Sequence, residues 1–208
     1  MAGIARQFIA KARDILKSEK SDQGVPTNGL LLRGFAELPT IPGMQERYNL
    51  KALALAVYPD YKGVSRLVGM DVVDGLQDLR GQMAALKENW SRYDYFFIHH
   101  KYTDSRGEDG DFDAKAAEIE KVDAILPSIL ELHPDVIVVT GDHSTPAVLK
   151  AHSGHPVPFL ISAGHVRPDG VKEFGESACA RGLWGVIHGT DIIKLQLSYA
   201  GRIMKYGA

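Results

Sequence analysis

The stretch VIVVTGDHSTP, Val136 to Pro146, decides the class of fold that the sequence predicts. It opens with four apolar residues in a row, a pattern typical of a strand that is covered on both faces. It continues into Asp142 and His143, an acid beside an imidazole. Two interpretations are open for this pair. One is a strand end followed by a helix that begins at Ser144 to Pro146, and the other is half of a metal site.

Similar apolar runs alternate with helix-like segments along the rest of the chain. The predicted strands are 29–32, 50–57, 93–100, 135–140 and 157–162. The predicted helices are 3–19, 62–69, 77–91, 112–131 and 190–199. The longest helix carries an apolar stripe at three- and four-residue intervals, formed by Phe112, Ala116, Ile119, Val122, Leu126 and Ile129. This alternation predicts an α/β fold with a mostly parallel sheet and helices on both faces.

Composition narrows the possible partners and the compartment. The chain has 208 residues, of which 45% are hydrophobic and 24% charged, as in ordinary globular proteins. A net charge of -2 gives no global attraction to nucleic acid or to an anionic membrane, and no apolar run approaches the ~20 residues of a spanning helix. The single cysteine, Cys179, excludes an internal disulfide and a thiolate cluster and favours a cytoplasmic location. The basic N-terminal helix leaves a targeting presequence open, although Asp14 and Glu19 argue against one.

Candidate metal ligands gather at the ends of three predicted strands. They lie in FFIHHKYTDSRGEDGD (96–111), in TGDH (140–143) and in AHSGHPVP (151–158), which holds His152 and His155. In a parallel sheet these loops are expected at one edge, where five or six nitrogen and oxygen ligands could converge. Imidazole and carboxylate without thiolate suit Zn²⁺ or Mn²⁺. Two such ions ~4 Å apart would hold the oxygens of a phosphoryl group.

Several of these residues also have a purely structural interpretation. His99 and His100 alternate faces, so we expect at least one of them to be structural. The acidic run 108–113 is typical of the start of a helix, where carboxylates favour the positive end of the dipole. Part of a calcium-loop pattern is also present, in Asp109, Asp111, Asp113 and Glu120, but Ala114 occupies the position that requires Gly and argues against such a loop.

Taken together, four motifs resemble the archaeal-type cofactor-independent (2,3-bisphosphoglycerate-independent) phosphoglycerate mutases of the alkaline phosphatase superfamily. In chain order they are LLLRGFAELP (30–39), YKGVSRLVGMDVV (61–73), HHKYTDSRGEDGDFDAKAAEIEKVD (99–123) and TGDHSTP (140–146) with AHSGHPVPFLI (151–161). The resemblance covers only the C-terminal half of the family pattern. It implies an alkaline-phosphatase-like α/β fold whose sheet is incomplete in this chain.

The resemblance implies two divalent metal ions, Mn²⁺ or Zn²⁺, with Mg²⁺ also possible. Asp142 and His143 would bind one ion, and Asp104 and His152 would bind the other. Glu108 stands where the family has a histidine ligand. A carboxylate there adds negative charge and favours the harder ions Mn²⁺ and Mg²⁺.

The implied activity is metal-dependent phosphoryl transfer, the interconversion of 3-phosphoglycerate and 2-phosphoglycerate in glycolysis and gluconeogenesis. The substrate would be a small phosphorylated molecule, and Lys62 and, less directly, Lys101 match positions that contact the transferred phosphate. The family transfers phosphate through a serine, and no serine matches that nucleophile. The serines near the motifs are Ser65, Ser105, Ser144 and Ser153.

The resemblance also implies how the chain is organised. Residues 1–28 resemble the tail of the family's inserted region, and 29–208 the C-terminal part of its metal-binding domain. We therefore expect Met1 to fall mid-protein and the activity to need an N-terminal half-subunit. The uncovered sheet predicts dimerisation or instability. Two alternatives remain: a phosphatase or phosphonate hydrolase of the same superfamily, or a noncatalytic metal-binding or regulatory domain.

Overall fold

The computed structural model describes residues 2–18, 29–32 and 37–203 of the chain. The chain is divided into two compact units, Met1–Thr40 and Ile41–Ala208. The first unit contains helix α1 (Ala2–Ser18), close to the helix predicted at 3–19. The predicted connection at 18–27 and part of the motif at 30–39 lie outside the described residues, and the domain boundary at residue 28 stays a prediction. No described helix is both long and apolar enough to cross a membrane.

The strand predicted at 29–32 is wrong. Residues 29–32 belong to no strand, and Leu31 is 87% exposed. A strand is held by hydrogen bonds to a neighbour, and no strand is described in the first unit. An apolar run without a partner strand forms no ladder.

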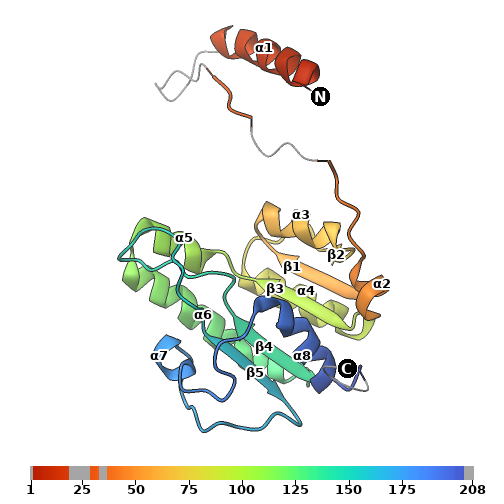
Figure 1. Cartoon of the computed structure of the whole chain (residues 1–208), viewed down its shortest axis with the longest axis vertical. Coiled ribbons are helices and arrows are strands. Elements are labelled where there is room, and N and C mark those ends of the chain that lie inside the picture. The colour runs from red at the N-terminus through yellow and green to blue at the C-terminus, as the bar shows by residue number, and fades with distance from the viewer. Residues whose placement is uncertain (1, 19–28, 33–36, 204–208) are drawn as a thin grey trace. The chain divides into compact units, whose positions relative to one another are not determined.

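The second unit is an α/β fold (Figure 1). Its strands are β1 (Ala52–Ala56), β2 (Asp71–Val72), β3 (Tyr95–His99), β4 (Val136–Thr140) and β5 (Phe159–Ala163). Its helices are α2 (Met44–Tyr48), α3 (Pro59–Leu67), α4 (Leu79–Asn89), α5 (Tyr102–Asp109), α6 (Phe112–Leu130), α7 (Glu176–Cys179) and α8 (Ile192–Tyr199). Single 3-10 turns lie at Trp90–Arg92 and Gly189–Asp191. The four other predicted helices and four predicted strands are all found, with ends that differ by a few residues.

Strand β1 is the centre of a three-stranded parallel sheet with the order β2-β1-β3. All five of its residues are buried. Leu53 and Leu55 pack on one face against Met83 and Leu86 of α4. Ala52 belongs to a second cluster, which includes Leu50 and Leu197. Helices therefore cover both faces of β1, which confirms the predicted architecture.

Strands β4 and β5 form a separate pair, and this pair is antiparallel. The connection from 141 to 158 therefore leaves β4 and enters β5 at the same edge. In a parallel pair, the residues just before the second strand would lie at the opposite edge. The predicted loops do meet at one edge, but the predicted reason, a parallel pairing, is wrong. Antiparallel pairing is what keeps His152 beside Asp142 and His143.

The apolar stripe predicted on α6 is only partly correct. Phe112 is 72% exposed and Ile119 is 50% exposed, whereas Ile125 and Ile129 pack against the core. The physical reason is that the N-terminal part of α6 lies along α5 and not over the sheet (Figure 1). Only the C-terminal half of the helix reaches the sheet core.

Candidate metal centre

Helix α5 presents two acidic residues above the carboxyl end of β3. Asp104 and Glu108 are four residues apart on this helix, so they lie one turn apart on the same face. The helix ends at Gly110, whose φ of 76° is left-handed, a conformation that glycine adopts without strain. Asp111 then caps α6 by accepting a hydrogen bond from the Ala114 N–H. The acidic run predicted to start one helix therefore also ends another, α5, which was not predicted.

The connection between β4 and β5 supplies the imidazoles. No helix begins at Ser144 to Pro146, so the predicted helix start is wrong. The chain instead makes a single turn in which the Leu149 and Lys150 N–H groups donate to the Pro146 carbonyl. Lys150 has a φ of 50°, and an isolated bridge joins Ser144 to Ser153. This reversal replaces the helix, because the chain must return to form β5.

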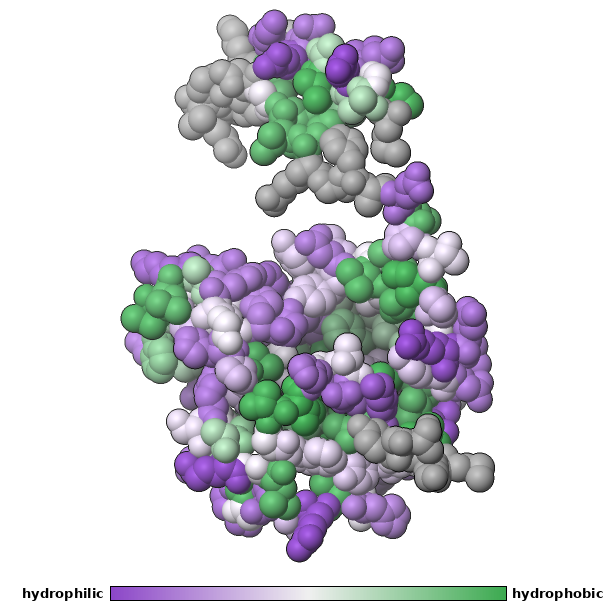
Figure 2. Space-filling view, viewed as in Figure 1, coloured by the Kyte–Doolittle hydropathy of each residue, from purple (hydrophilic) through white to green (hydrophobic). Residues whose placement is uncertain are grey.

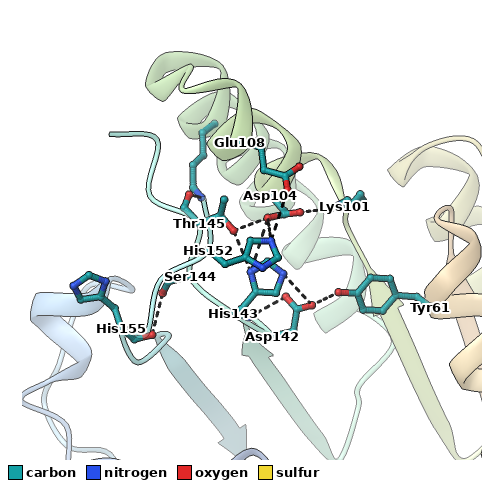
Figure 3. Close-up of polar contacts among 11 residues, drawn as sticks. Tyr61, Lys101, Asp104, Glu108, Asp142, His143, Ser144, Thr145, His152 and His155 are labelled. Carbon is teal, nitrogen blue, oxygen red and sulfur yellow. Dashed lines mark hydrogen bonds and ion pairs between the residues drawn. The ribbon is translucent and has the colours of Figure 1, made fainter. Parts of the chain in front are cut away.

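The reversal places three candidate ligands together. Asp104, His143 and His152 each offer one ligand atom, and these atoms all lie within 4.8 Å of one another (Figure 3). Asp104 Oδ1 is 3.9 Å from His143 Nδ1 and 3.5 Å from His152 Nε2. The two imidazole ring centroids are 3.9 Å apart. One carboxylate and two imidazoles are a donor set that suits Zn²⁺ or Mn²⁺.

The other two predicted ligands flank this group. Asp142 Oδ2 is 3.7 Å from His143 Nε2, and Glu108 Oε1 is 3.7 Å from His152 Nε2. All five predicted metal ligands therefore belong to one cluster, in which Asp104 lies within 4 Å of both imidazoles. Because Asp104 approaches both rings, the assignment of ligand pairs to two separate ions stays a prediction.

Asp104 is held as a carboxylate. Burial alone would raise its pKa, but hydrogen bonds from Lys101 and from the Thr145 hydroxyl hold the pKa of Asp104 below its usual value. The Thr145 hydroxyl lies 2.5 Å from Asp104 Oδ1 and 3.0 Å from His143 Nδ1. Lys101 forms an ion pair with the other carboxylate oxygen. A carboxylate kept ionised and oriented in this way is ready to bind a cation.

Tyr61 is a residue of the site that sequence reasoning missed. Its phenol donates a hydrogen bond to Asp142 (Figure 3), and its ring stacks on His99 with a centroid separation of 3.5 Å. Burial and the Asp142 carboxylate raise the pKa of the Tyr61 phenol. Although burial opposes it, the same hydrogen bond helps to keep the pKa of Asp142 low. The only signal in the sequence is that Tyr61 precedes Lys62 in its motif.

The neighbouring histidines lie outside the ligand group. Burial lowers the pKa of His99 to about 4, so its ring stays neutral near pH 7. His100 Nε2 lies 2.8 Å from Glu118 on α6. Gln82 of α4 is fully buried, and its amide donates to the carbonyls of Leu55 and His99. This side chain ties the carboxyl ends of β1 and β3 together beneath the site.

The remaining predicted residues are not brought into the group. Among the described residues, nothing joins the Lys62 side chain to the five ligands, although α3 places it next to Tyr61. His155 accepts at its carbonyl from the Ser144 hydroxyl and pairs with Ser153, and Figure 3 shows it apart from the cluster. None of the candidate serines has a described hydrogen bond to Asp104, His143 or His152.

Comparisons with known proteins show which proteins the chain resembles. The chain is 46% identical over 207 residues to a probable 2,3-bisphosphoglycerate-independent phosphoglycerate mutase of Thermotoga sp.. It is 49% identical over 210 residues to a probable mutase of the same name from Thermus thermophilus. Each alignment covers 100% of this chain but 50% of the relative. The chain therefore spans about half the length of these relatives, as its motifs predicted.

Solved structures also match nearly the whole of this chain, and the chain covers little more than half of each of them. A protein of Pyrococcus horikoshii superposes with a TM-score of 0.91 at 35% identity, covering 100% of this chain and 59% of that one. A cofactor-independent phosphoglycerate mutase from Thermoplasma acidophilum gives a TM-score of 0.63 at 25% identity, covering 96% and 52%. Residues 3–199 match the Metalloenzyme superfamily. The chain therefore belongs to the Metalloenzyme superfamily and resembles the C-terminal half of its 2,3-bisphosphoglycerate-independent phosphoglycerate mutases.

Proposed function

We propose that this chain carries the metal ligands of a 2,3-bisphosphoglycerate-independent phosphoglycerate mutase. It would act in the interconversion of 3-phosphoglycerate and 2-phosphoglycerate together with the part of the mutase that it does not cover. One observation carries the proposal. Asp104, His143 and His152 meet within 4.8 Å in a chain that aligns over its whole length with half of such enzymes.

The five candidate ligands would hold two divalent ions. His143 faces Asp104 with Nδ1 and Asp142 with Nε2, and His152 faces both Asp104 and Glu108. Oxygen ligands at both ends favour Mn²⁺, with Zn²⁺ or Mg²⁺ as the alternatives. When bound, such ions neutralise phosphoryl oxygens and lower the pKa of an attacking hydroxyl.

Two lysines of this chain, Lys101 and Lys62, would hold the phosphate. Lys101 is paired with Asp104 in the described structure. A cation bound to Asp104 would repel the nearby ammonium group and free it to contact an anionic oxygen. Lys62 follows Tyr61 on α3, and the Tyr61 hydroxyl donates a hydrogen bond to Asp142. Both lysines would thus bind and orient the phosphate.

Metal binding is the first test. Isothermal titration of the purified chain with Mn²⁺ and with Zn²⁺ should show saturable binding. Asp104→Asn should weaken it strongly, because this variant removes the charge that faces both imidazoles. Asp109→Asn is the matched control: it removes an acid of the same helix that, within the described part of the chain, is paired with Arg106 alone. Equal binding by both variants would place the metal elsewhere.

Turnover is the second test. The chain is mixed with the part of the Thermus thermophilus relative that it does not cover, and ³¹P NMR follows 3-phosphoglycerate with Mn²⁺ present. We expect 2-phosphoglycerate from the mixture and none when Asp104→Asn is used. Release of inorganic phosphate would favour the phosphatase alternative. Metal binding without any turnover would favour a noncatalytic domain.

A further inference from the structure

We propose that the cavity between α4, α5 and α6 binds a small organic anion, one with a flat apolar body and a carboxylate or phosphate group. The cavity has a volume of about 710 Å³, within the range of about 300–1,000 Å³ in which proteins bind small molecules. None of the five candidate metal ligands lines it. The site is therefore separate from the metal centre and does not depend on the proposed function.

The path of α6 opens this cavity. The N-terminal part of α6 lies along α5, and its C-terminal half packs with α4 over the sheet core (Figure 1). Between these contacts, the middle of α6 lines the cavity together with the first turns of α4 and α5. Met83 of α4 and Ile125 of α6 line it and also belong to the core cluster. The core packing therefore fixes an apolar wall before any ligand binds.

A buried carboxylate in the wall is already compensated by its neighbours. Glu118 is 8% exposed, and its two oxygens lie 2.6 Å from Lys121 Nζ and 2.8 Å from His100 Nε2. Burial alone would raise its pKa, but these two hydrogen bonds hold the pKa of Glu118 below its usual value. Because each oxygen has a hydrogen-bond donor beside it, Glu118 holds the wall together and leaves the other side chains to set the charge of the cavity.

Those other side chains favour an anion. Arg80 and Arg106 both line the cavity, and no ion pair is described for Arg80 within the part of the chain that the structure covers. Arg106 pairs with Asp109 on the outer surface, an exposed pair that contributes little. The other acid of the described lining, Asp78, caps α4 by accepting from the Gly81 N–H. Two guanidinium groups can bind a carboxylate or a phosphate through paired hydrogen bonds.

The uncharged lining defines the body of the ligand. Tyr102 lines the cavity beside His100, with ring centroids 5.5 Å apart, and is 38% exposed. An aromatic ring of a ligand can pack against such a ring and cover the apolar wall. An inorganic anion would leave that wall uncovered, and a neutral apolar molecule would leave the arginines unpaired. A molecule with both a flat apolar body and an anionic group satisfies the whole lining.

NMR of the ¹⁵N-labelled chain tests this site with defined probes. The chain is titrated with naphthalene-2-carboxylate and with 2-naphthyl phosphate, which distinguish the two anionic groups, in the presence of EDTA to keep the metal centre empty. We expect saturable shifts of the Met83, Arg106 and Ile125 amides with at least one probe, while the His143 and His152 amides stay unchanged. Acetate and neutral 2-naphthamide, which each carry half of the chemistry, should bind at least about 10-fold more weakly.

The neutral probe also controls for apolar surface elsewhere. Figure 2 shows hydrophobic residues at the surface over the region where Figure 1 draws β4, and these could attract any naphthyl group. Binding there would not distinguish the charged probes from 2-naphthamide. Selective binding of the charged probes therefore reports the arginines of the cavity.

Two variants locate the anionic group. Arg80→Gln should weaken binding of the charged probe by about 10-fold or more, since a hydrogen bond to a charged group is lost, and should leave 2-naphthamide unaffected. Lys87→Gln is the matched control, because it removes an exposed cation of the same helix that does not line the cavity. The inference is overturned if no probe shifts the cavity amides or if the shifts appear only at His143 and His152. Equal binding of the charged and neutral probes, equal binding of acetate, or equal binding by the two variants overturns it as well.

Discussion

Asp104 organises the site because it meets three different kinds of group. Its carboxylate faces two imidazoles, accepts from the Thr145 hydroxyl and pairs with Lys101. Only 12% of its side chain is exposed, so these contacts are weakly screened by water. The carboxylate therefore depends on neighbours that are not themselves ligands, and Thr145 is the neighbour that also reaches His143.

Removing the Thr145 hydroxyl should weaken metal binding without removing a ligand. Thr145→Val keeps the shape of the side chain but no longer orients Asp104 and His143. Groups that orient ligands change metal affinity by about 10- to 100-fold, and we expect a loss of that size by isothermal titration. Thr190→Val, at an exposed threonine, is the control and should bind as the unaltered chain does. An unchanged affinity in Thr145→Val would mean that the hydroxyl does not orient the ligands.

His99 should make the folded state sensitive to mild acid. Its pKa is lowered to about 4 by burial, whereas the unfolded chain binds that proton near pH 6.5. Between these values the unfolded state holds more protons, so the free energy of unfolding falls as the pH drops from about 6.5 to about 4. The loss should be on the order of 1–2 kcal/mol, since the ring is only partly buried.

Urea unfolding at several pH values checks this expectation. His99→Phe keeps a ring on Tyr61 but cannot take up a proton, so its stability should decline less over the same pH window. His165→Asn changes an exposed histidine and should follow the unaltered chain. If His99→Phe declined as steeply, the acid sensitivity would arise at another group.

The sequence predicted which candidate ligands lie together better than it predicted the residues that hold them in place. Asp104, His143 and His152 follow from residue type and motif order, because imidazole and carboxylate bind metal wherever they converge. Tyr61 and Thr145 act through contacts with residues far along the chain. No local pattern encodes such contacts, so they became visible only once the fold had placed α3 and the 141–158 connection around Asp104.

At the scale of elements, the site depends on how closely α5 approaches the connection after β4. Gly107 is buried in α5, and a Cβ there would collide with the Thr145 carbonyl oxygen and lie 3.0 Å from its Cγ2. The Lys115 ammonium donates to the same carbonyl at 2.7 Å. The missing side chain at residue 107 therefore allows Asp104 to approach the imidazoles.

Gly107→Ala should push α5 away from Thr145. We expect a loss of about 1–3 kcal/mol in the free energy of unfolding, the usual cost of overpacking, together with weaker metal binding. Gly63→Ala is a matched control in helix α3, where a Cβ would meet nothing within 4 Å. It should leave metal binding unchanged and add up to about 1 kcal/mol of stability. Urea unfolding and metal titration measure both effects, and equal behaviour of the two variants would contradict the close approach.

Elements were predicted well where periodicity was strong. Helix α4 and strand β1 were predicted from the spacing of their apolar residues, because the residues at those positions are the ones buried in the core. Helix α5 was missed because its mean character is polar and its boundary depends on Gly110 adopting a left-handed φ. The antiparallel direction of β5 was also missed, because the direction of a strand depends on the path of the preceding connection and not on its own residues.

At the scale of the whole molecule, the metal centre joins parts that the sheets leave separate. Asp104 follows β3 of the parallel sheet, while His143 and His152 belong to the connection within the antiparallel pair. In the described residues no strand links the two sheets, although α8 contacts both. The sequence predicted one mostly parallel sheet, and it could not show this break because each strand has an ordinary pattern. A bound cation would therefore act as a cross-link between the two sheets.

Metal should consequently stabilise the whole second unit. A ligand that binds only the folded state at about 100 times its dissociation constant adds about 2.7 kcal/mol to the free energy of unfolding. We expect a gain of that order for Mn²⁺ at such a concentration, measured by urea unfolding and reversed by EDTA. Asp104→Asn should lose most of the gain, whereas Asp109→Asn should keep it, since the ion pair described for Asp109 is with Arg106 and not with the cluster. A gain of the same size in Asp104→Asn would show that the cation stabilises the chain from another place and does not cross-link β3 to the β4–β5 pair.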